Sequence, residues 1–353
     1  MLTEYQRNFM NGNETINGGS RIPYIDFLKF IGLTGIIIAH VGSPSWAMMA
    51  RSFDVPFMVM LSSLLANRSY EKLLTSGATV KDYYLSRFKR LVFPTWIFLL
   101  LYFIISFVFK GHTESIKKYI ASFALTRYGI GYVWIILIYL YSAMLVPLFA
   151  KLKTSRKAIL IVSVSYLIYE IAYYYQVGLN GNIYVKALVD TTFYYIVPYG
   201  LLTFLGYNYI FFKRSTKVGI AAVSAVAFVG LFIFYRVYTG NFQLVQIAKY
   251  PPRIYYLSYG IACSFILLLY CEGKVLKVFS NAIIKFVSSH SMWIYLWHIL
   301  VLQVYENLHL PEIWFIKLVV VYCVSSVIVV VINCLLDKSE ENKKIAILKY
   351  LRG

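Results

Sequence analysis

The sequence predicts an all-α, polytopic integral membrane protein with about ten transmembrane helices and with both termini in the cytoplasm. Apolar and aromatic residues make up 60% of the 353 residues, whereas an ordinary soluble domain is about 45–50% apolar. Charged residues make up 14%, and the mean hydropathy is +0.67. This composition excludes an intrinsically disordered chain and a disulfide-rich secreted module. The formal net charge of +19 needs a separate explanation.

Apolar stretches of roughly bilayer length follow one another along most of the chain. The second and the ninth are short, which indicates buried or tilted helices. We expect a polar cytoplasmic tail at 1–22, a transmembrane domain at 23–336 and a second cytoplasmic tail at 337–353. The predicted spans are 24–41, 52–66, 91–109, 132–150, 158–175, 193–212, 218–236, 254–271, 291–305 and 313–335.

The distribution of basic residues tests this topology. With ten spans, 23 of the 34 Lys and Arg residues fall on the side of the two termini, and 9 fall on the opposite side. Lys29 and Lys317 lie inside spans. The positive-inside rule therefore places both termini in the cytoplasm. Because topology explains most of the basic excess, we expect membrane lipid and not nucleic acid as a partner.

The first span carries three ionisable residues, which are costly inside a membrane and are usually functional or paired. They are Asp26, Lys29 and His40. On one continuous helix, Lys29 and His40 would be about 20° apart around the axis and roughly 16 Å apart along it. Asp26, three residues before Lys29, can pair with it. The alternative is an ion pair at one membrane interface and a capping or snorkelling histidine at the other.

Three later segments also place polar residues at or inside spans. The second span opens with Asp54, a proline and a pair of serines. Arg87 and Arg90 precede Pro94 at the start of the third span, and the ninth span contains His298. The segments are 53–63, 87–94 and 291–298.

Together these motifs resemble the family-3 membrane acyltransferases, which O-acylate cell-surface glycans. That family carries an Asp, then Arg or Lys, then His after ten intervening residues, in its first helix. Its second helix often reads Val-Pro-Leu-Phe-Phe-Met-Ile-Ser-Gly, its third follows Arg-x-x-Arg, and a late helix carries Tyr-Leu-Trp-His. Two positions depart from the pattern: Lys29 replaces the commoner Arg, giving a point charge instead of a bidentate donor, and Ser63 replaces Gly. The matching residues are Asp26, Lys29, His40, Val55, Pro56, Met60, Ser62, Arg87, Arg90, Pro94 and Tyr295 to His298.

The resemblance implies a catalytic role for His40 and a cytoplasmic acyl-CoA donor, with acetyl-CoA as the first expectation. A neutral histidine suits a general base that deprotonates a sugar hydroxyl at pH 7. Asp54 either orients the imidazole, as a carboxylate does in hydrolytic triads, or caps its helix. The acceptor would be a surface polysaccharide or its lipid-linked oligosaccharide precursor. The enzyme would be a multi-pass protein of a bacterial cytoplasmic membrane.

The donor site is expected to contain the intramembrane and pre-helix cations. Lys29, Arg87 and Arg90 would hold the phosphates of CoA, with Asp26 beside Lys29. For the two arginines, membrane topology alone is the alternative explanation. His298 either lines the donor channel or is a packed core histidine.

Several questions stay open in the sequence. Glu170 either contacts the acceptor or reaches the membrane interface. Neither metal-binding spacing nor a glycine-rich phosphate loop occurs, so no metal is expected. A carrier or exporter of a glycan or small anion is the alternative function, because the same polar residues would suit a substrate path. Transport without acyl-CoA dependence would distinguish it; a purely structural scaffold would not explain the buried Lys29 and His40.

Overall fold

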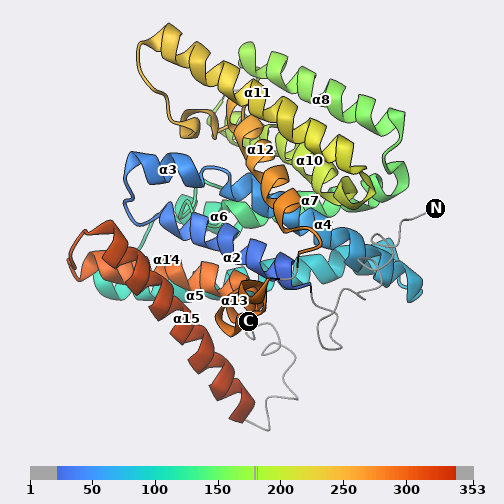
Figure 1. Ribbon diagram of the computed structural model, residues 1–353. Helices are drawn as coiled ribbons and strands as arrows, with labels where there is room; N and C mark the ends of the chain where they lie inside the picture. The colour runs from blue at the N-terminus through green and yellow to red at the C-terminus, as the bar shows by residue number, and fades with distance from the viewer. Residues whose placement is uncertain (1–21, 179, 181, 275, 339–353) are drawn as a thin grey trace.

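Helices are the regular secondary structure of residues 22–178, 180, 182–274 and 276–338, the part that the computed structural model describes, and these residues contain no β-strand (Figure 1). The predicted all-α class is therefore confirmed, and the helices that are long and apolar enough to cross a membrane agree with a polytopic membrane protein. Each predicted span corresponds to one long helix. These helices are α2 (Pro23–Ile38), α4 (Asp54–Thr75), α5 (Val80–Lys110), α7 (Trp134–Leu152), α8 (Arg156–Tyr174), α10 (Phe193–Asn208), α11 (Arg214–Thr239), α12 (Ile254–Cys271), α14 (Ser291–Asn307) and α15 (Trp314–Lys338).

Short helices that the sequence did not predict lie between the long ones. They are too brief to give a bilayer-length apolar run. Apart from residues 22, 337 and 338, the two expected tails lie outside the described residues. The short helices are α3 (Ser45–Arg51), α6 (Ile116–Phe123), α9 (Ile183–Thr191) and α13 (Ala282–Ser289), with 3₁₀ turns η1 (Tyr209–Phe211), η2 (Val245–Ala248) and η3 (Lys277–Ser280).

Two of the long helices, α2 and α14, are shorter than a typical membrane span, as is α10 with 16 residues, but α10 belongs to a longer helical segment at Ile183–Phe211. Eight helical segments of the described chain are long and apolar enough to cross a membrane, whereas α2 and α14 have 16 and 17 residues. The short apolar stretch expected at 52–66 lies in a largely buried helix, as predicted, but the helix itself is longer, because α4 has 22 residues. Its polar second half stays helical through tertiary contacts: Tyr70 is buried, and the Asn67 amide donates a hydrogen bond of 3.0 Å to the carbonyl of Tyr207.

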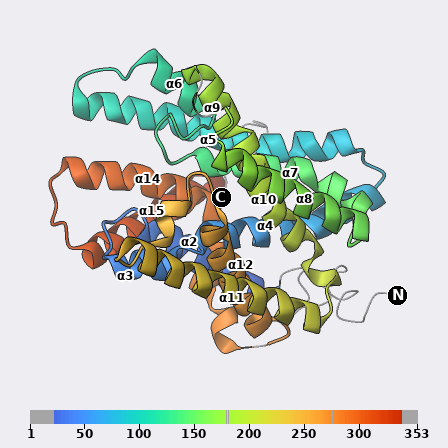
Figure 2. The same cartoon turned by 90° about the horizontal axis from the view of Figure 1, so that it is seen from above.

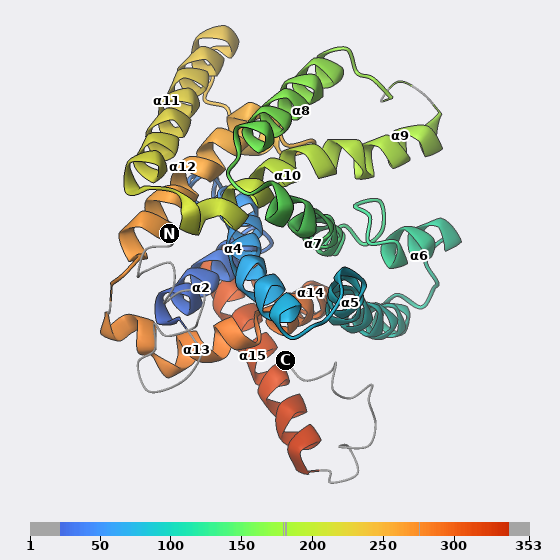
Figure 3. The ribbon, with the colours of Figure 1, turned by 90° about the vertical axis from the view of Figure 1, so that its right-hand side faces the viewer.

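Helix α4 is the centre of the bundle, and it packs against α2, α7, α10 and α12 (Figures 2 and 3). Two glycines allow close approach to it. A Cβ atom at Gly206 of α10 would overlap the backbone of Met60, and one at Gly260 of α12 would overlap the ring of Pro56. By contrast, α8, α11 and α15 lie at the periphery with few buried residues (Figure 1). Their exposed apolar side chains suit contact with lipid.

Contacts between loops define two ends of the bundle. At the first end, which we call the histidine end, Arg127 pairs with Asp190, Gln246 bonds Ser52, and the rings of α3 and α15 meet. At the second end, the arginine end, the beginnings of α2, α5 and α11 lie with α13 and with the end of α12. Segments that follow odd-numbered long helices meet at the histidine end, as expected for helices that alternate in direction.

Candidate active site

His40 lies in a turn and not on a helix. Helix α2 ends at Ile38, and the backbone N–H of His40 donates to the carbonyl of Ile37 at 2.9 Å. Ala39 shares its N–H between the carbonyls of Gly35 and Ile36, both at 3.2 Å. The expected continuous helical face from Lys29 to His40 is therefore wrong for its last two residues, Ala39 and His40, which lie beyond the end of α2. These hydrogen bonds tighten the last turn after α2, and this turn sets the direction in which the His40 imidazole points.

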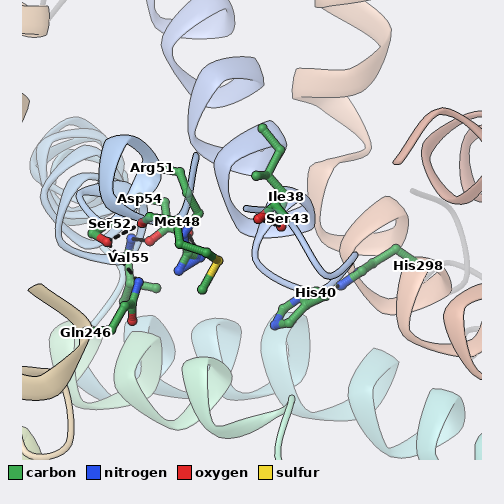
Figure 4. A network of polar contacts seen from close by, with 10 residues as sticks. All are labelled: Ile38, His40, Ser43, Met48, Arg51, Ser52, Asp54, Val55, Gln246 and His298. Carbon is green, nitrogen blue, oxygen red and sulfur yellow. Dashed lines mark hydrogen bonds and ion pairs between the residues drawn. The ribbon is translucent and has the colours of Figure 1, made fainter. Parts of the chain in front are cut away.

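The imidazoles of His40 and His298 are in direct contact, with Nδ1 of His40 3.0 Å from Nε2 of His298 (Figure 4). His298, on α14, is fully buried, and its Nδ1 bonds the carbonyl oxygen of Tyr295. A carbonyl oxygen only accepts, so in the neutral ring this Nδ1 carries the proton and Nε2 accepts. The network thus assigns the proton of the His40 ring to Nδ1. The Nε2 lone pair of His40 is left as a base.

Aromatic rings enclose the histidine pair. The ring of Tyr132 meets that of His40 edge-on at 5.0 Å, and the ring of Tyr295 lies 5.0 Å from that of His298. The hydroxyl of Tyr295 donates to the carbonyl of Tyr132 at 2.6 Å. These contacts fix both imidazoles from α14 and from the segment before α7.

The carboxylate of Asp54 does not face the histidine pair. Its Oδ2 accepts from Nη1 of Arg51 at 2.8 Å, and its Oδ1 accepts from the N–H of Val55 at 2.7 Å. Both charged side chains are buried. Phe53, not Asp54, is the N-cap of α4, and a carboxylate in the first helical turn is favoured by the helix dipole. The residue in contact with the His40 ring is thus His298, where the sequence suggested Asp54.

A cavity of about 270 Å³ lies between α2, α4, α5, α7 and α14. Lys29, Arg87 and Arg90 are in its wall, so the structure brings together the three cations that were expected to bind the donor. Tyr139 and Tyr295 are also in the wall, and Tyr295 touches the histidine pair from the other side. The remaining wall is largely apolar. It includes Leu33, Ile36, Met58, Leu61, Leu65, Leu91, Ile135, Ile136 and Val146.

Two residues expected at the donor site lie outside the wall of this cavity. Asp26 is buried and accepts a hydrogen bond of 2.5 Å from Oγ of Ser288 on α13. His298 lies behind Tyr295, against His40. Inside the wall, the guanidinium of Arg87 bonds Oγ of Ser69 and lies 5.1 Å from the ring centroid of Tyr83.

Glu170 holds the segment that leads into α12. Its Oε2 accepts from Nε of Arg253 at 2.6 Å, and its Oε1 accepts from the hydroxyl of Tyr166 at 2.7 Å and from the N–H of Ile254 at 3.1 Å. The guanidinium of Arg253 also lies 3.9 Å from the ring centroid of Tyr173. Glu170 therefore clamps residues 253–254 to α8, a partnership that neither alternative from the sequence included.

Sequence reasoning missed two cations near His40. Arg51 and Lys249 are both buried, and both are close enough for their charges to act on the His40 ring. Burial, opposed by Asp54, lowers the pKa of Lys249 to about 8. Both belong to the 9 basic residues on the sparsely charged side of the predicted topology. That scarcity was the signal that could have singled them out.

The fold and the site define a polytopic membrane protein in which half-buried His40 contacts buried His298, close to a cavity that has cations in its wall. Residues 22–337, nearly the whole chain, match the acyltransferase domain of the family 3 acyltransferases. The chain therefore belongs to that family and is a membrane acyltransferase. No curated protein and no solved structure matches it. Within the described residues, no group of three or more His, Cys, Asp or Glu side chains is arranged to hold a metal ion.

Proposed function

We propose that the protein transfers an acyl group, acetyl in the first instance, from cytoplasmic acyl-CoA to a sugar hydroxyl of a surface polysaccharide or its lipid-linked precursor, in a bacterial cytoplasmic membrane. The observation that carries this proposal is the 3.0 Å contact between His40 and His298, which leaves Nε2 of His40 as a proton acceptor. Family membership supports the acyl transfer itself.

The reaction follows from this proton arrangement. Nε2 of His40 takes the proton of the acceptor hydroxyl while the hydroxyl oxygen attacks the thioester carbonyl. The imidazolium that forms keeps its Nδ1–H bond to Nε2 of His298, which holds the ring in place. The C–S bond then breaks, and the proton on Nε2 passes to the leaving CoA thiolate. His298 thus acts as a positioning residue, as an acceptor does behind the histidine of a hydrolytic triad.

The cavity supports the placement of the donor. Lys29, Arg87 and Arg90 offer positive charge for the phosphates of CoA, and the apolar wall between them and Tyr295 suits an alkyl-rich pantetheine arm. The volume of about 270 Å³ suits this arm and not the whole coenzyme, because pockets for drug-sized ligands measure about 300–1,000 Å³. The nucleotide would stay at the arginine end, which the charge distribution assigns to the cytoplasm.

The direct test is acyl transfer by the purified full-length protein in lipid nanodiscs. We expect His40→Ala to lower kcat by about 100- to 10,000-fold, the usual contribution of general acid–base catalysis, with the affinity for acetyl-CoA unchanged. His112→Ala, at an exposed position before α6, is the matched control. A normal rate in the His40 variant would refute the mechanism. Transport of a glycan without release of CoA would instead support a carrier.

His298 gives a second test of the same arrangement. We expect His298→Ala to lower kcat about tenfold to 100-fold with little change in KM, and His298→Gln to recover part of the loss because its amide oxygen can accept from Nδ1 of His40. Equal rates for the alanine and glutamine variants would contradict the positioning role.

A further inference from the structure

Lys249 is a buried residue whose ammonium group has no ion pair among the described residues. Its side chain is 7% exposed. Its Nζ lies 5.6 Å from the ring centroid of Trp134 and 5.3 Å from that of Tyr250, and within the described chain it forms neither a hydrogen bond nor an ion pair. Contacts with two rings offset part of the desolvation, but an isolated buried charge remains costly.

The other buried and half-buried cations of the histidine end differ from Lys249 in this respect. Each has a carboxylate of its own within 3.1 Å. The pairs are Arg51 with Asp54 at 2.8 Å, Lys118 with Glu114 at 3.0 Å, Arg127 with Asp190 at 2.8 Å, Arg253 with Glu170 at 2.6 Å, and Lys317 with Glu306 at 3.1 Å and Glu312 at 2.9 Å. Lys249 therefore supplies a positive charge that the protein does not neutralise by direct contact.

The segment that carries Lys249 is held on both sides. Before it, the amide of Gln246 donates to Oγ of Ser52 at 2.9 Å (Figure 4). After it, the hydroxyl of Tyr169 donates to the carbonyl of Pro252 at 2.7 Å, and Glu170 clamps Arg253. The backbone is therefore fixed on both sides of Lys249, which gives the ammonium group a defined position.

The surroundings of Lys249 suit a sugar. The charge of Lys249 acts on the ring of His40, and the rings of Tyr250 and Tyr128 are each 43% exposed at this end. The guanidinium of Arg127 lies 5.7 Å from the ring centroid of Tyr250 and 5.3 Å from that of Tyr128. Amphipathic aromatic rings of this kind give a ligand an apolar contact face together with a polar tip.

We propose that Lys249 binds a negatively charged group, a carboxylate or a phosphate, on the acceptor sugar, while a hydroxyl of the same acceptor reaches Nε2 of His40. This inference rests on the proposed function and specifies its acceptor class. A neutral acceptor would leave the ammonium desolvated and unpaired, whereas an anionic one would complete a charge-assisted hydrogen bond. Arg51 is a poorer candidate than Lys249 because its guanidinium already forms an ion pair with Asp54.

The test compares three matched probes: methyl glucoside, methyl glucuronide and methyl glucoside 6-phosphate. Their binding to the full-length protein in nanodiscs is measured by saturation-transfer NMR, and CoA release from acetyl-CoA is measured in parallel. We expect at least one anionic probe to bind tenfold or more tighter than the glucoside, and which one binds identifies the carboxylate or the phosphate. Lys249→Met should abolish this preference, and Lys249→Arg should retain it. Lys186→Met, at an exposed position of α9, is the control.

Equal binding of the three probes to the wild type would overturn the inference, and so would an anion preference that survives Lys249→Met. If Lys249→Met fails to fold, loss of the preference at high salt in the wild type replaces it, because salt screens charge recognition. A preference that depends on Lys249, without CoA release for any probe, would confirm the anion site and refute acyl transfer to that sugar. Failure of the anion-site inference and failure of the proposed acyl transfer are therefore distinguishable.

Discussion

The two ends of the helix bundle use positive charge differently. At the histidine end, five buried or half-buried cations have carboxylate partners, and Lys249 stands apart from them. At the arginine end, Lys29, Arg87 and Arg90 gather around one cavity, and Arg87 contacts the neutral side chains of Ser69 and Tyr83. The difference teaches that charge count alone does not locate a binding site. What matters is which cations the protein has already neutralised.

The largest effect is expected at the arginine end. Each charge-assisted hydrogen bond contributes about 1.5–3 kcal/mol, so the double variant Arg87→Ala, Arg90→Ala should weaken acetyl-CoA binding about 100-fold or more. Calorimetry on the nanodisc-embedded protein measures this. Lys89→Ala, between the two arginines on α5, should leave the affinity within about twofold. Unchanged affinity in the double variant would contradict the assignment of the donor site to the arginine end.

The pH dependence of acceptor binding sharpens the contrast. The pKa of Lys249 is lowered to about 8 by burial, with Asp54 raising it and Arg51 lowering it. The ammonium is charged below this value and neutral above it, so affinity for an anionic glycoside should fall about tenfold between pH 7 and pH 9. His40 and Tyr250, which also lie near Lys249, affect all glycosides alike, so methyl glucoside is the reference. A preference that does not change over this interval would exclude Lys249 as the recognising group.

The smallest effect is expected at the clamp of the Lys249 segment. Glu170→Gln keeps the hydrogen bonds from Tyr166 and Ile254 but removes the charge that holds Arg253. A partly exposed ion pair is worth up to about 1 kcal/mol, so KM for the anionic acceptor should rise about fivefold while KM for acetyl-CoA stays constant. A matched loss of acetyl-CoA affinity would indicate that the two ends are not independent. Glu114→Gln, which breaks a 3.0 Å pair with Lys118, serves as the comparison.

The sequence predicted all ten long helices because apolar length is a strong signal even without tertiary information. It also selected Lys29, Arg87 and Arg90, which meet at one cavity. Contacts between residues that are far apart in the chain could not be predicted from the sequence. Asp26 bonds Ser288, and His40 bonds His298, each across more than 250 residues.

Local geometry set a second limit on prediction. Extending a regular helix through His40 overlooked the turn after Ile38. Lys249 follows a 3₁₀ turn in a loop, where periodicity gives no indication of burial. The local pattern does not distinguish such a basic loop residue from one that only sets topology, so the scarcity of basic residues on that side was the remaining signal.

In the loop between α11 and α12, the residues that hold the loop in place are different from Lys249, the residue that we propose recognises the acceptor. Gln246, Pro252 and Arg253 attach it to the bundle through hydrogen bonds and an ion pair, whereas the ammonium group of Lys249 contacts the described part of the bundle only through aromatic rings. If Lys249 recognises the acceptor as we propose, a substitution at position 249 would change which acceptor charge is preferred while the hydrogen bonds of Gln246 and Pro252 and the ion pair of Arg253 still hold the loop. The specificity for the acceptor could then change through one side chain, without a change in the residues of the donor cavity.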